Sequence, residues 1–208
     1  FRTTHAIAPR WMMFKPIILE TNHRQGKDKQ YAELLNRIRV GEQTKEDIAL
    51  LKTRVRPKDH EDLKAASLYI VCKRKECAEI NTNNLNSLDG ELITIEAKHH
   101  HATQAKYKPK IDSRDGTVGS TSFADKLKLK IEAKVMIIHN IDTADGLTNG
   151  QMGKLVKIVK TTTGEVDKLI IKLNDPKPGQ KNRSSNQNLL SKFPNCVVIE
   201  RVNYQYSL

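Results

Sequence analysis

The chain has 208 residues, with 36 Lys and Arg against 24 Asp and Glu and a formal net charge of +12. This length suits one large domain or two small ones, and the charge favours nucleic acid over an anionic membrane surface, because the chain shows no basic amphipathic helix. No apolar run is long enough to span a bilayer, no signal peptide is recognisable, and the three cysteines cannot all pair. We therefore expect a reduced, intracellular protein without membrane contact, and the start at Phe1 rather than Met leads us to expect a longer parent protein.

The first half of the chain alternates between helical and strand-like segments. Tyr31, Leu34, Leu35 and Ile38 form one apolar stripe at helical spacing, and Gly41 is suited to ending that helix. Short apolar runs predict buried strands at residues 17–19, 68–72 and 92–97. This alternation predicts an α/β sheet with parallel strands.

Two further helices are predicted before the last of these strands. Thr44 and Asp47 approximate a capping box, which predicts a short helix directly after it. A third helix is expected from about Lys75 to Gly90. Pro57 marks the break between the two.

The second half of the chain has a period of two. Residues 98–122 are polar and predict a loop or linker, and residues 127–137 alternate as one continuous strand. Further strands are predicted at residues 154–160, 166–173 and 196–202. Gly164-Glu165 and Asn149-Gly150 predict tight hairpins, and residues 174–191 a polar loop. Short strands joined in this way indicate a small antiparallel barrel.

Two stretches resemble PIF-type (petite-integration-frequency) helicases, a family that includes the helicases of Helitron transposons. The first comprises residues 19–25 (LETNHRQ) and 34–41 (LLNRIRVG), and the second is residues 127–156 (LKLKIEAKVMIIHNIDTADGLTNGQMGKLV). The chain departs from the family at Glu132, where Gly is usual, and at Cys72, where Thr is frequent. After Val159 only a general strand pattern matches.

The resemblance implies an α/β fold that combines part of a RecA-like parallel sheet with a small SH3-like barrel. Residues 1–97 would be part of the second RecA-like helicase domain, and residues 98–122 a linker. Residues 123–208 would be the inserted SH3-like barrel, near whose end the chain can return to the RecA-like sheet.

The resemblance also implies an ATP-dependent 5′→3′ DNA helicase that acts in the nucleus on single-stranded DNA, in repair, recombination or telomere maintenance. ATP and Mg²⁺ would be bound mainly by a first RecA-like domain. No G-x-x-x-x-G-K-[ST] motif and no His-Lys-Ser-Gln-Gly-type motif occur in the chain, so we predict no ATP hydrolysis by the chain alone. The alternative is a non-motor nucleic-acid-binding module, such as a degenerate transposon helicase remnant.

Arg24 is the predicted catalytic residue. It follows a predicted strand, and the resemblance assigns it the role of an arginine finger on the γ-phosphate of ATP. Gln25 is predicted to support the nucleotide or Arg24. The other interpretation of Arg24 is an exposed loop arginine before a helix.

Candidate nucleic-acid-binding residues lie in two places. Lys73 and Asn81 belong to a basic turn and the helix after it, where phosphate would meet backbone N–H groups. His139, Asn140 and Asn149 flank glycines that are expected to shape the barrel. Each set has an alternative structural interpretation, as a solvated surface or as turn-forming residues.

The sequence also predicts a basic surface for phosphates and no metal site. Four lysines of the alternating segment, Lys126, Lys128, Lys130 and Lys134, are a candidate phosphate footprint. We predict no metal site, because His99 to His101 are adjacent and Cys72 and Cys77 lack zinc-ligand spacing.

Overall fold

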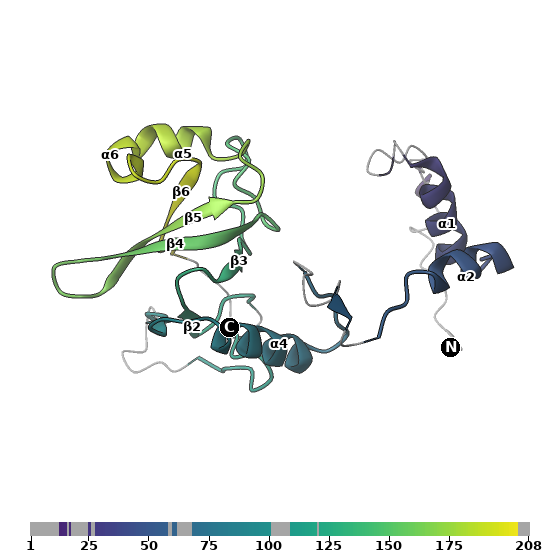
Figure 1. Cartoon of the computed structure of the whole chain (residues 1–208), viewed down its shortest axis with the longest axis horizontal. Helices are drawn as coiled ribbons and strands as arrows, with labels where there is room; N and C mark the ends of the chain where they lie inside the picture. Colours follow the sequence, from purple (N-terminus) through teal and green to yellow (C-terminus); the bar gives the residue numbers. More distant parts are fainter. Residues whose placement is uncertain are drawn as a thin grey trace. The chain divides into compact units, whose positions relative to one another are not determined.

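A computed structural model describes residues 13–15, 17, 25, 28–57, 60–61, 68–100, 109–119 and 121–203. The chain forms two compact units, Phe1–Ala65 and Ala66–Leu208 (Figure 1). No helix in the described ranges is long and apolar enough to cross a membrane.

The first unit contains helices α1 (Lys29–Val40) and α2 (Lys45–Lys52). The carboxylate of Asp28 caps α1 by accepting the Tyr31 N–H at 3.0 Å. Gly41, with φ of 79°, ends α1 in the left-handed conformation. The predicted helix and its glycine end are confirmed.

The predicted capping box of α2 is also confirmed. The Thr44 hydroxyl accepts the Asp47 N–H at 3.2 Å, and the Asp47 carboxylate accepts the Thr44 N–H at 3.0 Å. The same carboxylate receives two bonds from the Arg37 guanidinium of α1, at 2.7 and 2.6 Å. This bidentate contact joins the two helices and holds the pKa of the buried Asp47 well below its usual range.

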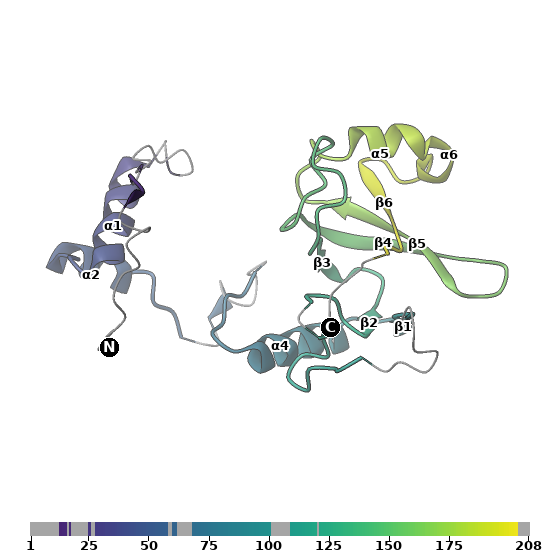
Figure 2. The ribbon, with the colours of Figure 1, turned by 180° about the vertical axis from the view of Figure 1, so that it is seen from behind.

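The second unit combines strands with helices at both ends. Its elements are α4 (Arg74–Asn86), β1 (Ile93–Glu96), β2 (Lys126–Leu129), β3 (Lys134–Met136), β4 (Met152–Lys160), β5 (Val166–Leu173), α5 (Gln180–Ser185), α6 (Gln187–Leu190) and β6 (Cys196–Glu200). Strands β1 and β2 form an antiparallel ribbon, and β3-β4-β5-β6 form an antiparallel sheet in that order. Figures 1 and 2 show α5 and α6 beside β6.

The four-stranded sheet has an apolar cluster on each face. The main core contains Leu155 and Val197, both fully buried, and Leu129 from the ribbon packs into it. The second cluster contains Ile170 of β5 and Leu190 of α6, so the α5–α6 segment covers part of the outer face. The ribbon therefore packs on one face of the sheet and the α5–α6 segment on the other.

The predicted parallel RecA-like sheet is not found among the described strands, all of which pair antiparallel. The predicted strand at residues 68–72 is wrong: these residues form no strand, and Leu68 and Ile70 are 55% and 92% exposed. An apolar run becomes a strand only when a partner strand and a core cover it, and neither is described here. The strand β1 pairs antiparallel with β2.

The described strands do not close into the predicted barrel. The Asn182 side-chain oxygen accepts the Val198 N–H at 2.8 Å, and its amide nitrogen donates to the Val198 carbonyl at 2.9 Å. This side chain therefore occupies a pairing position on the outer edge of β6, and the sheet stays open. The predicted domain boundaries at residues 97 and 122 stay predictions.

The predicted continuous strand at residues 127–137 is wrong, because a turn separates β2 from β3. Glu132 lies in this turn with φ of 72°, in the left-handed region. Its N–H donates to the Leu155 carbonyl at 2.8 Å, and the Leu155 N–H donates to the Ala133 carbonyl at 2.9 Å. Pairing with β4 therefore stabilises a turn that the alternating pattern does not reveal.

Several other predictions are tested in the second unit. Strands β4, β5 and β6 and the Gly164 turn are confirmed, with Gly164 at φ of 85°. The predicted loop at residues 174–191 is wrong, since it contains α5 and α6. The third predicted helix is confirmed but ends at Asn86, before Gly90. Asn149-Gly150 is not a two-residue hairpin, because the longer loop of residues 137–151 joins β3 to β4.

Candidate nucleic-acid interface

The loop of residues 137–151, here called the β3–β4 loop, brings three predicted site residues together. His139, Asn140 and Asn149 are all exposed on it. The Asn149 N–H donates to the side-chain oxygen of Asn140 at 2.9 Å, so the two ends of the loop are joined by these residues. The His139 ring lies 5.8 Å from the Phe123 ring, centroid to centroid. The loop therefore presents an aromatic ring and amides on one exposed segment.

The tip of the loop is held by its own backbone. Asp142 and Leu147 pair as an isolated β-bridge, and the Asp142 carboxylate accepts the N–H groups of Ala144 and Asp145, both at 3.1 Å. Gly146 has φ of 75°, and Leu147 is 1% exposed in the main core. The buried side chain of Leu147 therefore anchors the tip of the loop in the main core.

Asp145 connects the loop to α5, which sequence reasoning missed. Its two carboxylate oxygens accept the backbone N–H groups of Lys181 and Asn182, both at 2.9 Å, and its carbonyl accepts the Gly179 N–H at 2.7 Å. Gly179, at the start of α5, has no side chain to cap the helix, so Asp145 provides the cap from another segment. The only local signal was an Asp-Gly pair, which predicts a turn but not this contact.

An ion pair strengthens this connection. The Lys181 ammonium donates to the Asp142 carboxylate at 3.1 Å. This hydrogen bond is the main cause of the lowered pKa of Asp142, and the bond from the Asp145 N–H lowers it further. The β3–β4 loop is thus tied to the first turn of α5 by both of its aspartates.

The second candidate region lies at the start of α4. Lys73 is the exposed N-terminal flanking residue of the helix, and no side chain caps the helix there. Arg74 forms ion pairs with Asp112 at 3.7 Å and with Asp115 at 3.4 Å. Asn81 is exposed and donates to the Cys77 sulfur at 3.7 Å. The predicted strand-to-helix turn is therefore a loop-to-helix turn, and DNA contact by Lys73 and Asn81 stays a prediction.

The predicted lysine footprint is divided by the turn at Glu132. Lys126 of β2 pairs with Glu96 at 2.9 Å, and Lys130 donates to the Leu88 carbonyl at 2.6 Å. These two lysines stabilise the ribbon and its contact with the end of α4. Lys134 lies on β3, in a different sheet from Lys126.

Arg24 lies outside the described residues, so its role stays a prediction. Gln25 is a half-buried turn residue whose carbonyl accepts the Asp28 N–H at 2.9 Å. Within the described ranges, no group of three or more His, Cys, Asp or Glu is arranged to hold a metal ion.

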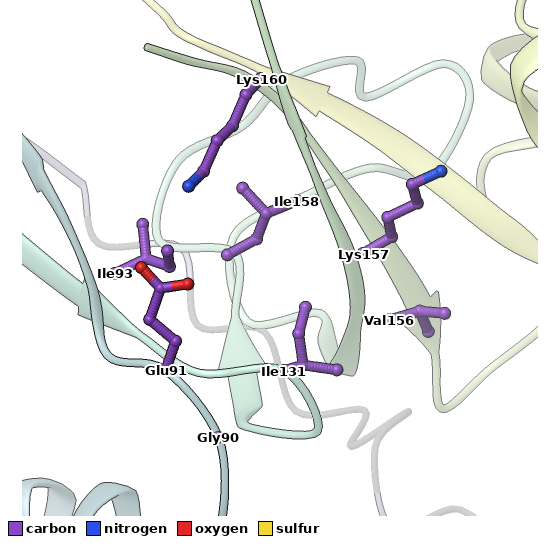
Figure 3. A pocket seen from close by; sticks show the side chains of 8 residues that line it. All are labelled: Gly90, Glu91, Ile93, Ile131, Val156, Lys157, Ile158 and Lys160. Carbon is purple, nitrogen blue, oxygen red and sulfur yellow. The ribbon is translucent and has the colours of Figure 1, made fainter. Parts of the chain in front are cut away.

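A shallow groove of about 350 Å³ lies between the ribbon and β4 (Figure 3). Three isoleucines line the groove, Ile93, Ile131 and Ile158, and Lys160 extends toward Glu91. The Lys157 side chain points away from the groove, and its ammonium lies over the Phe193 ring. None of the predicted site residues lines this groove.

Comparisons with known proteins find relatives of the segment that contains the β3–β4 loop. Residues 121–158, which include the whole β3–β4 loop, match the family described as DNA helicase Pif1, 2B domain. ATP-dependent DNA helicase PIF1 of Emericella nidulans is 29% identical over 147 residues, which is 70% of this chain and 18% of that protein. The Danio rerio protein of the same name is 31% identical over 136 residues, or 64% of this chain and 19% of that protein. The chain thus spans about a fifth of the length of these relatives.

Solved structures of related proteins are more distant. The crystal structure of Pif1 helicase from Candida albicans is 23% identical, with a TM-score of 0.47, over 74% of this chain and 36% of that one. The matched region is similar to DNA helicases. Within that class it is similar to PIF-type helicases, which confirms the predicted resemblance to that family.

Proposed function

We propose that this chain is part of an ATP-dependent 5′→3′ DNA helicase and supplies a surface for single-stranded DNA. The observation that carries the proposal is the match of residues 121–158 to the Pif1 2B domain, over the segment that exposes His139, Asn140 and Asn149. Exposed amides and an aromatic ring are suited to hydrogen bonding and stacking with unpaired bases. The net charge of +12 favours the same partner.

The nucleotide would be bound mainly by another RecA-like lobe of the same protein, with Mg²⁺. The sequence contains no P-loop, and the described residues form no metal site of their own. Leu68 and Ile70, exposed beside the start of α4, support a contact with such a lobe. The proposed function implies a nuclear, intracellular protein, with Arg24 as the arginine that reaches the γ-phosphate.

Arginine replacement in the longer protein, with its P-loop lobe, tests this function. We expect Arg24→Ala to lower DNA-stimulated ATP turnover by a thousand-fold or more, on the order found for arginine fingers. Arg39→Ala, at the exposed end of α1, is the matched control and should leave turnover unchanged. Turnover near wild type in Arg24→Ala would show that the finger assignment is wrong.

A longer protein without DNA-stimulated ATP turnover would instead favour the non-motor binding module. The DNA surface is tested separately in the 208-residue chain. Replacing His139, Asn140 and Asn149 together by Ala should weaken binding of a single-stranded oligonucleotide about tenfold or more, since stacking and amide contacts each contribute. Unchanged affinity would remove the β3–β4 loop from the DNA surface.

A further inference from the structure

Three lysines lie side by side across the four-stranded sheet. The strand register places Lys134 of β3 directly opposite Lys154 of β4, and Lys154 directly opposite Lys172 of β5. Directly opposed residues of antiparallel strands project from the same face. Neighbouring strands are about 4.8 Å apart, so the lysine row of Lys134, Lys154 and Lys172 spans about 10 Å.

The lysine row lies on the outer face of the sheet. Its neighbours along the strands, Leu155 and Ile171, point into the main core, so the lysines point away from it. Lys172 is opposite Cys196, on the side covered by the α5–α6 segment. Burial raises the pKa of the Cys196 thiol, and the positive charges of Lys172 and of Arg183 of α5 oppose that rise.

The strands that carry the row, and the segment beside β6, contain few acidic residues. Strands β3, β4 and β5 together contain six lysines and one acidic residue, Asp167, at the far end of β5. Residues 176–199, which include α5 and α6, contain four Lys and Arg and no Asp or Glu. Within the row, Lys154 pairs with Glu132, whose carboxylate lies 2.8 Å from the Lys154 ammonium. Both side chains of that pair are about half exposed, at 57% and 49%.

Like charges directly opposite one another destabilise a sheet, so the row lowers the stability of the free protein. A chain of phosphates along the row offsets that repulsion, because each phosphate carries a negative charge that a lysine can neutralise. We propose that the lysine row binds the phosphate backbone of single-stranded nucleic acid, as a surface separate from the β3–β4 loop. The choice of single-stranded DNA as the partner rests on the proposed function.

Salt-dependent binding tests the proposal in the 208-residue chain. A single-stranded oligonucleotide is titrated against wild type and against a variant in which all three row lysines are replaced by Gln. Each lost phosphate contact lowers the slope of log K against log salt by about 0.7, so the triple variant should lose about 2 in slope and about tenfold or more in affinity at low salt. The matched control replaces three exposed lysines of the first unit by Gln, namely Lys29, Lys45 and Lys52.

The control has the same net charge as the row variant. Equal losses of affinity and salt slope in the two variants would show that only the overall charge matters, and this would overturn the proposal. A wild-type chain without salt-dependent binding would overturn it as well. Binding to phosphatidylserine vesicles in preference to the oligonucleotide would assign the row to a membrane surface instead.

Two further measurements separate binding from folding. Glu132→Gln removes the opposing carboxylate and should raise oligonucleotide affinity about two- to fivefold; an unchanged or lower affinity would count against Lys154 as a contact. The row variant should be at least as stable as wild type to urea, because it relieves the lysine repulsion. A row variant much less stable than wild type would contradict this repulsion and overturn the proposal.

The row and the loop are distinguished by comparing their variants. If the loop variant (His139, Asn140 and Asn149 to Ala) loses affinity while the row variant does not, the row proposal fails and the proposed function stands. If only the row variant loses affinity and salt slope, the row is the DNA surface and the loop assignment fails.

Discussion

The left-handed turn at Glu132 offers a quantitative test of the turn between β2 and β3. A residue with a side chain at φ of 72° costs roughly 1–2 kcal/mol relative to its preferred conformations, and Gly does not have this cost. Glu132 also pairs with Lys154 at 2.8 Å, but such half-exposed pairs contribute only about 0–1 kcal/mol. Both Glu132→Gly and Glu132→Ala lose the pair, and only Glu132→Gly relieves the backbone.

We therefore expect Glu132→Gly to be more stable than Glu132→Ala by about 1 kcal/mol, equivalent to about 3 °C in Tm. Urea denaturation followed by the β-sheet circular dichroism measures this difference. Lys128, exposed on β2 with ordinary strand geometry, is the matched control, and there Gly should be the less stable replacement. Equal stability of the two Glu132 variants, or a more stable Ala variant, would refute the left-handed conformation and the turn built on it.

Three other changes test the packing, the capping and the ion pair. Gly153→Ala should destabilise the second unit by about 1–3 kcal/mol in urea denaturation, because the new methyl carbon would lie 2.6 Å from the Lys172 carbonyl oxygen. Asp145→Ala should cost about 1–2 kcal/mol and increase hydrogen exchange at the first turn of α5, since two backbone N–H groups lose their acceptor. The stability of the first unit should fall as the pH drops below about 3.8, because the Arg37 hydrogen bond depresses the pKa of Asp47 in the folded state and its contribution is lost on protonation.

Each of these predictions has its own control. Lys160→Ala, at the exposed end of β4, alters the same strand without a close backbone approach and should cost less than Gly153→Ala; the reverse order would contradict the close strand approach at Gly153. Asp167→Ala removes an exposed strand carboxylate and should leave α5 exchange unchanged. Asp47→Asn should reduce the acid dependence of α1 and α2 and leave the smaller part that comes from Glu46, whose pKa is lowered by a backbone hydrogen bond; an unaltered pH profile in that variant would show that another group is responsible.

The sequence alone determined the elements whose stabilising contacts are local. Helix α1 could be predicted because its apolar stripe and the glycine at its end lie within one segment, and α2 because its capping box does. Strands β4 and β5 could be predicted because a short turn at Gly164 joins them. The family relationship was likewise contained in contiguous motifs, including residues 127–156.

Tertiary structure alone decided the features that depend on residues far apart in the chain. The break at Glu132 depends on hydrogen bonds to Leu155, and α5 begins under a cap from Asp145. The sequence also indicated lysines along one strand, whereas the register aligns Lys134, Lys154 and Lys172 across three. Local periodicity describes which residues share a face of one element, but only long-range pairing decides which elements share a surface.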